Sequence, residues 1–206
     1  MLHKAALSLL GLMLMLPGAA LLAADRSGQA MNFTPLLGFR DGGQLAVTTV
    51  DERRNLDGSA VVGLLASVEF EPGQHYEFLY SRQETTLAGL QQGVSLEYVQ
   101  IGGRLDFRGR EWVPYLSGGF GVTRIHARGD EGGSELRPGA SVAVGVEWRL
   151  TDRLALRTEG RGYLSLTDGS RGLMCVSGGE GAFCELAFAG DVLGQFELTA
   201  GMTVRF

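Results

Sequence analysis

The chain has 206 residues, a formal net charge of −5, 32 Gly and only 5 Pro. This length fits one domain, and without a basic excess we expect no nucleic-acid partner. Abundant Gly with scarce Pro is typical of strands and turns and argues against a disordered chain.

The N-terminal residues have the three parts of a secretory signal peptide. Lys4 gives a positively charged start, residues 5–16 are apolar, and the small residues at 22–24 offer a cleavage site. An uncleaved anchor helix is the alternative, but the apolar stretch is shorter than the roughly 20 residues that a helical span needs. We therefore expect residues 1–24 to be removed during export and residues 25–206 to form the mature domain.

Most of the remaining chain consists of segments in which apolar and polar residues alternate. In one of them, Val62, Leu64 and Phe70 share one face, and Ser67 and Glu69 share the other. Alternation with a period of two is typical of a strand with one apolar and one polar face. The pattern predicts eight strands, at residues 31–40, 59–70, 75–85, 94–107, 112–126, 137–150, 153–166 and 194–206.

Two segments fit this pattern less well. Residues 41–58 are polar and rich in Gly, so we interpret most of them as a long loop, with residues 45–50 as an alternative extension of the first strand. In the fourth strand, Leu96 and Tyr98 are out of phase with the residues that follow, which predicts a bulge or a strand end outside the apolar zone. Residues 167–193 form the longest predicted loop.

The connections between the predicted strands are alternately long and short. This order predicts an all-β fold, an eight-stranded antiparallel up-and-down transmembrane β-barrel with its short turns on the periplasmic side. The final strand is long enough to cross a bilayer when tilted, which takes about 9–11 residues. A strand of a soluble β-sandwich is the alternative explanation of a single segment, but the pattern recurs along the whole chain.

The polar faces of the predicted strands carry six acidic and six basic residues. In the dry core of a soluble barrel, each unpaired ion would cost several kcal/mol. We therefore expect the apolar faces to meet lipid and the charges to pair inside, where every base is an Arg that can bond two carboxylates. A barrel of eight strands is about filled by its own side chains, so we expect no open channel. The predicted interior charge network is Arg40, Glu69, Glu77, Arg104, Asp106, Glu147, Arg149, Arg157, Glu159, Arg161, Glu197 and Arg205.

Aromatic residues cluster at the predicted short turns. Their positions are those of an interfacial girdle, although a general preference of aromatic residues for strands is an alternative explanation. The residues concerned are Tyr76, Phe107, Trp112, Trp148 and Phe206.

Cys175 and Cys184 are the only cysteines, and both lie in the last long loop. An exported protein reaches an oxidising compartment, so we expect a disulfide, which would be worth roughly 2.5–3 kcal/mol. A metal or redox pair is the alternative, but the spacing is not C-x-x-C and no His is close in sequence. We expect no catalytic site, cofactor or metal, because His126 and Ser134 near the outer rim belong to no recognisable Ser/His/acid set.

The alternating segments, the terminal Phe206 and the sequence W-V-P-Y-L-S-G-G-F-G-V at 112–122 resemble the outer-membrane β-barrel superfamily that includes the OmpA transmembrane domain, OmpX and OmpW. The stretches Y-E-F-L-Y-S-R-Q-E-T at 76–85 and E-G-R-G-Y at 159–163 are similar to a proteobacterial branch of porin-family outer-membrane proteins. This resemblance implies a location in the bacterial outer membrane, with lipid and lipopolysaccharide as partners. It also implies that Phe206 is the C-terminal signal for the outer-membrane assembly machinery. In contrast to full OmpA, we expect no peptidoglycan-binding periplasmic domain after Phe206.

Three functions are compatible with these predictions. The first is a structural or surface-interaction barrel that acts through its outer loops. The second, implied by the OmpW resemblance, is a narrow carrier for small hydrophobic molecules, although Leu65 and Leu79 are the only aliphatic residues that we expect well inside the lumen. The third is a lipid A-modifying enzyme. It is the least favoured of the three, and we expect the protein to have no enzymatic activity.

Overall fold

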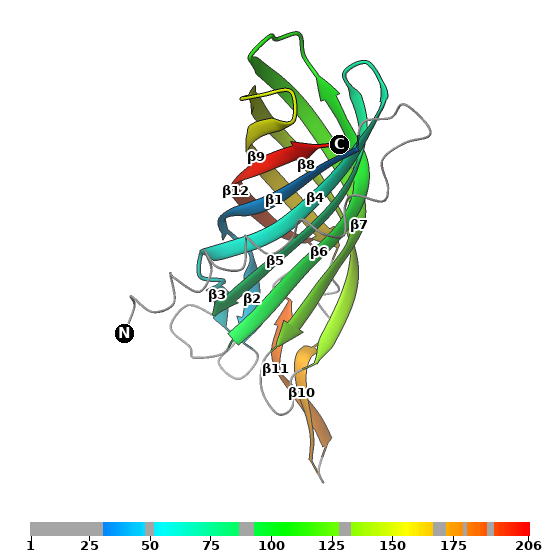
Figure 1. Cartoon of the computed structure of the whole chain (residues 1–206). Helices are drawn as coiled ribbons and strands as arrows, with labels where there is room; N and C mark the ends of the chain where they lie inside the picture. Colours follow the sequence, from blue (N-terminus) through cyan, green and yellow to red (C-terminus); the bar gives the residue numbers. More distant parts are fainter. Residues whose placement is uncertain are drawn as a thin grey trace, which may run out of the picture.

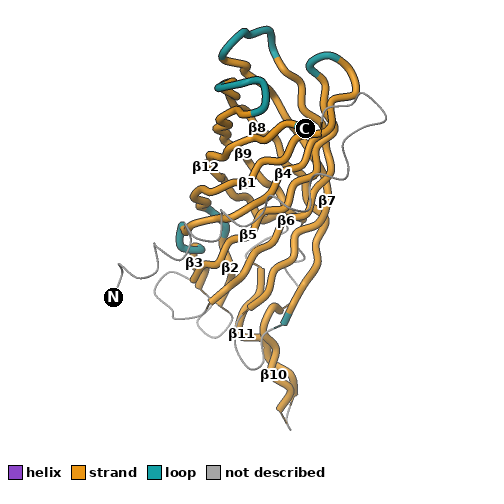
Figure 2. Tube along the Cα trace, viewed as in Figure 1, coloured by secondary structure: helices purple, strands orange, loops and turns teal. Residues whose placement is uncertain are grey.

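The computed structural model describes residues 31–47, 52–86, 93–127, 133–166, 172–178, 181–188 and 192–206. The predicted signal peptide lies outside these residues. Within them the chain consists of strands joined by turns and loops (Figure 2). None of the described residues belongs to a helix long and apolar enough to cross a membrane.

Eight strands close into a barrel in the order β1-β12-β9-β8-β7-β6-β5-β4, and β4 pairs with β1 to complete the ring (Figure 1). Every pair in the ring is antiparallel, so the predicted eight-stranded up-and-down barrel is confirmed. The barrel strands are β1 (Met31–Asp41), β4 (Ser59–Glu71), β5 (Gln74–Thr86), β6 (Gly93–Asp106), β7 (Trp112–Ala127), β8 (Ser134–Arg149), β9 (Leu154–Leu166) and β12 (Val192–Arg205).

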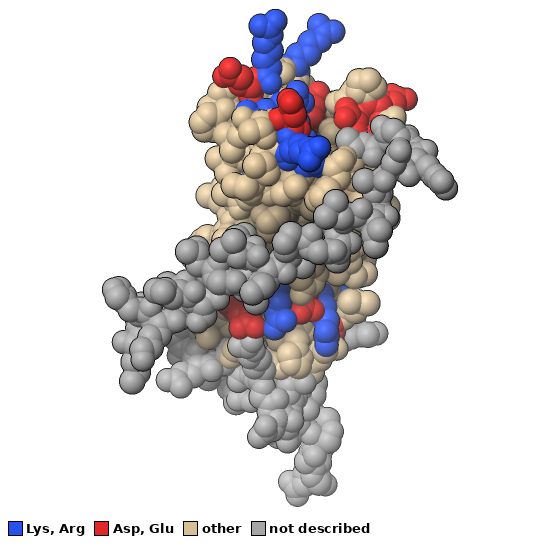
Figure 3. All heavy atoms as spheres, viewed as in Figure 1, with Lys and Arg blue, Asp and Glu red and all other residues tan. Residues whose placement is uncertain are grey.

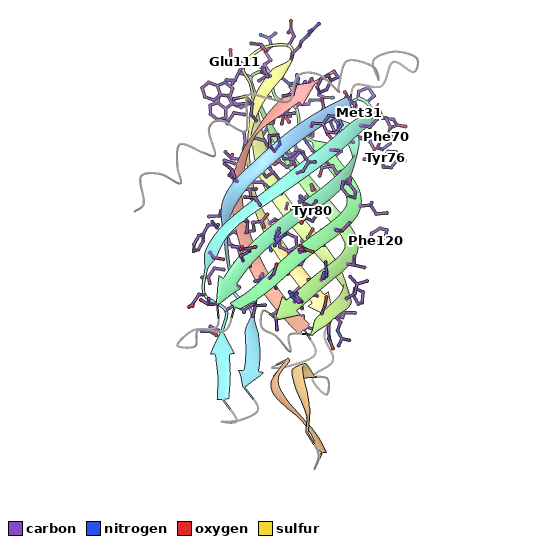
Figure 4. All side chains as sticks on the ribbon, turned by 60° about the horizontal axis from the view of Figure 1, so that its bottom comes forward. Met31, Phe70, Tyr76, Tyr80, Glu111 and Phe120 are labelled. Atoms are coloured by element: carbon purple, nitrogen blue, oxygen red, sulfur yellow. The ribbon has the colours of Figure 1, made fainter. Side chains whose placement is uncertain are left out.

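Side chains alternate between the lumen and the outer wall along each barrel strand. On β9, Arg157 and Glu159 are buried while Leu164 and Leu166 are exposed. On β7, Phe120 is 65% exposed, and Figure 4 shows it pointing away from the barrel. Because the side-chain period of a strand is two, the apolar set of each strand falls on one face, and here that face is the outer one.

Four short strands lie beyond the long-loop end of the barrel (Figure 1). They are β2 (Gln44–Val47), β3 (Glu52–Asn55), β10 (Gly172–Gly178) and β11 (Gly181–Phe188), and they form a sheet in the order β10-β11-β2-β3. The predicted loops 41–58 and 167–193 therefore contain strands, and the alternative in which residues 45–50 prolong the first strand is wrong. The reason is the pair Gly42 and Gly43, whose φ angles of 97° and 94° turn the chain away from β1 before β2 begins.

Of the two explanations predicted for the start of the fourth strand, the bulge is wrong, and a strand end outside the apolar zone fits, because Glu97 and Arg124 face outward there and form an ion pair. β6 pairs with β5 and with β7 without a register shift. Leu96 and Tyr98 are 0% exposed and face the lumen, in phase with Gln100 and Arg104. They looked out of phase because the lumen was expected to be polar along its whole length.

Candidate functional site

The lumen is the candidate site because its lining gathers most of the buried charged side chains of the protein. At the short-turn end, Arg104 donates to Asp106 at 2.5 Å and to Glu147 at 2.8 Å. Arg205 donates to the second carboxylate oxygen of Glu147, and His75 Nε2 lies 3.2 Å from Asp106. Each of the two acids is therefore bonded through both of its oxygens.

A second group fills the middle of the lumen. Arg157 donates to Glu77 at 2.9 Å and to Glu159 at 2.6 Å, and all three side chains are buried. Arg161 donates to the other oxygen of Glu159 at 2.7 Å, and the Tyr115 hydroxyl donates to Glu159 at 2.9 Å. The Arg157 guanidinium also lies 4.4 Å from the centre of the Tyr115 ring, in cation–π geometry.

Serine hydroxyls complete the hydrogen bonding of this middle group. Arg161 donates to Ser141 at 2.9 Å and to Ser117 at 3.0 Å, and Ser117 donates to Glu77 at 2.9 Å. The sequence-based network contained only charged residues and missed these serines. The sequence could have indicated these serines by their positions, because the alternation along each strand places them on the same inward face as the charged residues.

A third group lies closer to the long loops. Arg40 donates to Glu197 at 2.8 Å and also bonds Ser81, and Tyr163 donates to the second oxygen of Glu197 at 3.1 Å. The Arg40 guanidinium lies 4.6 Å from the centre of the Tyr98 ring and 4.9 Å from that of Tyr163. A buried arginine is thus compensated by one carboxylate and two aromatic faces, which fixes its side chain across the lumen.

An apolar cluster lines the lumen from the middle of the barrel to its long-loop end, alongside the third group. The expectation that Leu65 and Leu79 are the only aliphatic residues well inside is therefore wrong. The cluster consists of Leu36, Leu56, Leu65, Leu79, Val94, Leu96, Tyr98, Ile125, Ala127, Tyr163 and Leu193.

The polarity of the wall reverses at the long-loop end, which explains the part of the cluster that lies there. Leu96 and Ile125 are buried in the lumen, whereas their neighbours Glu97 and Arg124 face outward and form an ion pair at 3.5 Å. Strand segments that extend past the bilayer meet water on the outside, so their inner faces become an ordinary apolar core. We call the outward-facing residues Arg82, Glu97 and Arg124 the charged collar. This collar marks the edge of the apolar zone on the outer wall.

The structure brings most of the predicted network residues together. Asp106 and Arg205 are half-buried members of the group at the short-turn end. Glu69 accepts a hydrogen bond from the backbone of Gly73 at 2.9 Å, and Arg149 is exposed at the end of β8. Eight of the twelve are buried in the lumen: Arg40, Glu77, Arg104, Glu147, Arg157, Glu159, Arg161 and Glu197.

Aromatic side chains on the outer wall surround the short-turn end. Trp112 and Trp148 stack with ring centroids 4.9 Å apart, and Phe70 stacks on Tyr76 at 4.2 Å. Phe206 is exposed, packs edge-on against Phe33, and donates its backbone N–H to Met31. These positions are those of an aromatic belt at a membrane interface.

The backbone register pairs Cys175 of β10 directly with Cys184 of β11. This pairing supports the predicted disulfide, since directly opposite strand residues lie close enough to be bridged. Purified protein treated with a thiol-alkylating reagent is expected to take up no label without reductant and two labels with it, measured by intact mass. Two labels without reductant would contradict the disulfide.

The two residues considered for catalysis are brought together at the outer rim. His126 on β7 pairs in register with Ser134 on β8, and Ser134 accepts a hydrogen bond from Arg124 at 3.1 Å. Within the described ranges, no group of three or more His, Cys, Asp or Glu side chains is placed to hold a metal ion.

No protein-family model matches the chain, and no curated protein matches it. Solved structures do match. Neisserial surface protein A has 14% sequence identity and a TM-score of 0.59, over 87% of this chain and 100% of that protein. The outer membrane protein OprG from Pseudomonas aeruginosa has 11% identity and a TM-score of 0.53, over 89% and 98% of the two chains. Outer membrane protein AlkL, whose structure was determined in DMPC lipid bilayers, has 14% identity and a TM-score of 0.52, over 89% and 94%. The shared fold and the apolar outer wall show that this chain has the eight-stranded β-barrel fold of these outer-membrane proteins, as the sequence predicts.

Proposed function

We propose that this protein is an integral outer-membrane barrel that acts at the cell surface through its long-loop end and does not serve as a channel. The observation that carries this proposal is the packing of the lumen, where ion pairs and an apolar cluster bury the inward side chains against one another. The sheet of β2, β3, β10 and β11 extends beyond that closed lumen (Figure 1). With the short turns in the periplasm, this sheet faces the exterior of the cell.

Lipopolysaccharide is the partner that the charged collar is placed to meet. Arg82 lies 2.8 Å from Glu84 and 3.5 Å from Glu97, and Arg124 lies 3.5 Å from Glu97. Figure 3 shows red and blue side chains on the outer wall near this end, separated by an uncharged band from those at the short-turn end. The side chains of Arg82 and Arg124 are 41% and 56% exposed, so their ion pairs at the surface are weak. Each arginine can therefore exchange its carboxylate partner for a bidentate bond to a phosphate group.

The double substitution R82Q/R124Q is expected to weaken lipopolysaccharide binding about tenfold, because each arginine would supply charge-assisted hydrogen bonds to phosphate. Binding is measured with the detergent-solubilised protein and compared with R110Q, a matched change at the short-turn end. Unchanged binding in the double variant, or an equal loss in R110Q, would contradict the proposed surface role. Planar-bilayer recordings of the unmodified protein are expected to show no large single-channel conductance.

A carrier for small hydrophobic molecules is the second candidate function. It is favoured by the apolar cluster, which lines the long-loop end of the lumen and gives an apolar molecule a compatible entrance. Uptake of a fluorescent hydrophobic probe by cells with and without the protein distinguishes the two functions. Equal uptake rules out the carrier.

A further inference from the structure

A polar cavity of about 620 Å³ opens at the short-turn end of the barrel, opposite to the proposed surface-interacting end. Its wall includes parts of all three short turns, among them Gly73, Arg108 and Asp152. It also includes the two ends of the barrel seam, through Asn32 on β1 and Arg205 on β12. Five arginines and four carboxylates line it, together with His75.

The deeper carboxylates of this cavity have little remaining capacity to accept hydrogen bonds. Glu147 accepts from Arg104 through one oxygen and from Arg205 through the other. Asp106 is bonded by Arg104 through one oxygen and lies 3.2 Å from His75 through the other. Two of the five arginines and two of the four carboxylates therefore neutralise one another within the protein.

The other three arginines, Arg108, Arg149 and Arg153, are exposed and form no ion pair with any residue in the described ranges. Arg108 comes from the β6–β7 turn, and Arg149 and Arg153 come from the two sides of the β8–β9 turn, so the three arginines approach the cavity from two hairpins. The remaining carboxylates on the wall are Asp152 and Glu69, and Glu69 already accepts a backbone N–H at 2.9 Å. The cavity is thus rich in guanidinium donors and short of acceptors.

We propose that this cavity binds a phosphate group through Arg108, Arg149 and Arg153. Phosphate presents several strong acceptor oxygens, and the planar fork of a guanidinium matches them in a bidentate manner. The cavity lies at the level of the aromatic belt, because Val113, Glu147 and Arg149 of its wall are the chain neighbours of the outward-facing Trp112 and Trp148, and lipid headgroups meet water at this level. Two sources of phosphate reach this level: the headgroup of an inner-leaflet phospholipid and a soluble periplasmic phosphate ester.

Trp112 and Trp148 provide a reporter, because they are the only 2 tryptophans of the chain and are adjacent in sequence to Val113, Glu147 and Arg149 of the cavity wall. Protein in a neutral detergent is titrated in one arm with inorganic phosphate. In the other arm it is titrated with phosphatidylglycerol dissolved in the same neutral detergent, and tryptophan fluorescence is followed in both arms. The variant R108Q/R149Q/R153Q is expected to bind at least about tenfold more weakly in whichever arm shows binding. R110Q, which removes an exposed arginine of the same β6–β7 turn that does not line the cavity, is expected to bind like the unmodified protein.

A response to phosphatidylglycerol alone identifies the lipid headgroup as the source, and a response to inorganic phosphate alone identifies a soluble ester. The proposal is overturned if neither arm changes the fluorescence of the unmodified protein, if the triple variant binds as tightly, or if R110Q loses as much. D152N gives a second test that does not depend on the folding of the triple variant. Removal of this facing carboxylate should tighten binding, and weaker binding would equally overturn the proposal.

Discussion

Replacement of Arg157 with methionine is expected to lower the free energy of unfolding by about 3–5 kcal/mol. Arg157 is 1% exposed and bonds Glu77 at 2.9 Å and Glu159 at 2.6 Å. Without it, Glu159 still has Arg161 as a counter-ion, whereas Glu77 is left with a serine hydroxyl. A buried carboxylate without a counter-ion keeps its desolvation cost and loses the attraction that offset it.

Unfolding by urea in lipid vesicles, followed by tryptophan fluorescence, measures this loss. Arg124→Met is the matched control, because the Arg124 side chain is 56% exposed and its 3.5 Å pair with Glu97 should contribute less than about 1 kcal/mol. The double variant R157M/E77Q is expected to recover part of the stability, since it removes the orphaned charge together with its partner. A loss in R157M no larger than in R124M would show that water screens the lumen.

The sequence predicts which side chains of a barrel strand face the lumen and which face outward, because in a period-two pattern the apolar residues can all lie on only one face. A slip of one residue on β9 would move Arg157 and Glu159 from the lumen into lipid and move Leu164 and Leu166 into the lumen. The same reasoning holds for each barrel strand. The number of barrel strands and their inside-out polarity within the apolar zone therefore follow from local sequence alone.

The pairing inside the lumen could not be predicted in this way. Arg40 is the register neighbour of Glu197 and also bonds it. Arg157, in contrast, is the register neighbour of Glu147 but bonds Glu77 across the lumen. The stagger of the closed barrel and the reach of each side chain decide between these cases, and neither is encoded in the alternation of a single strand.

Two further features required knowledge of distant segments. The polarity reversal that buries Leu96 depends on where the bilayer ends, which several neighbouring strands define together. The short sheet depends on β11 pairing with β2, two segments near opposite ends of the chain. Local alternation over four residues is too short a signal to separate such a strand from a polar loop.

Two adjacent glycines on β6 provide the second large prediction. A Cβ atom on Gly102 would lie 2.0 Å from the backbone oxygen of Gly118 and 2.6 Å from the Cα atom of Gly119. A Cβ atom on Gly103, which faces the outer wall, would have its nearest neighbour at 3.5 Å, the backbone oxygen of His75. Gly102 therefore has no room for a methyl group, whereas Gly103, the next residue on the same strand, has room for one.

Gly102→Ala is expected to lower the free energy of unfolding by about 3 kcal/mol, because the backbone of β7 cannot move aside without loss of ladder hydrogen bonds. Gly103→Ala is expected to change it by less than about 1 kcal/mol, and in the stabilising direction, since alanine restricts the unfolded chain. Both variants keep the charge and the polarity of the wall, so the same urea titration tests the inward and outward assignment of β6 independently of any ion pair. Equal losses at the two positions would mean that the wall is packed alike on both faces, in conflict with a filled lumen and a lipid-exposed exterior.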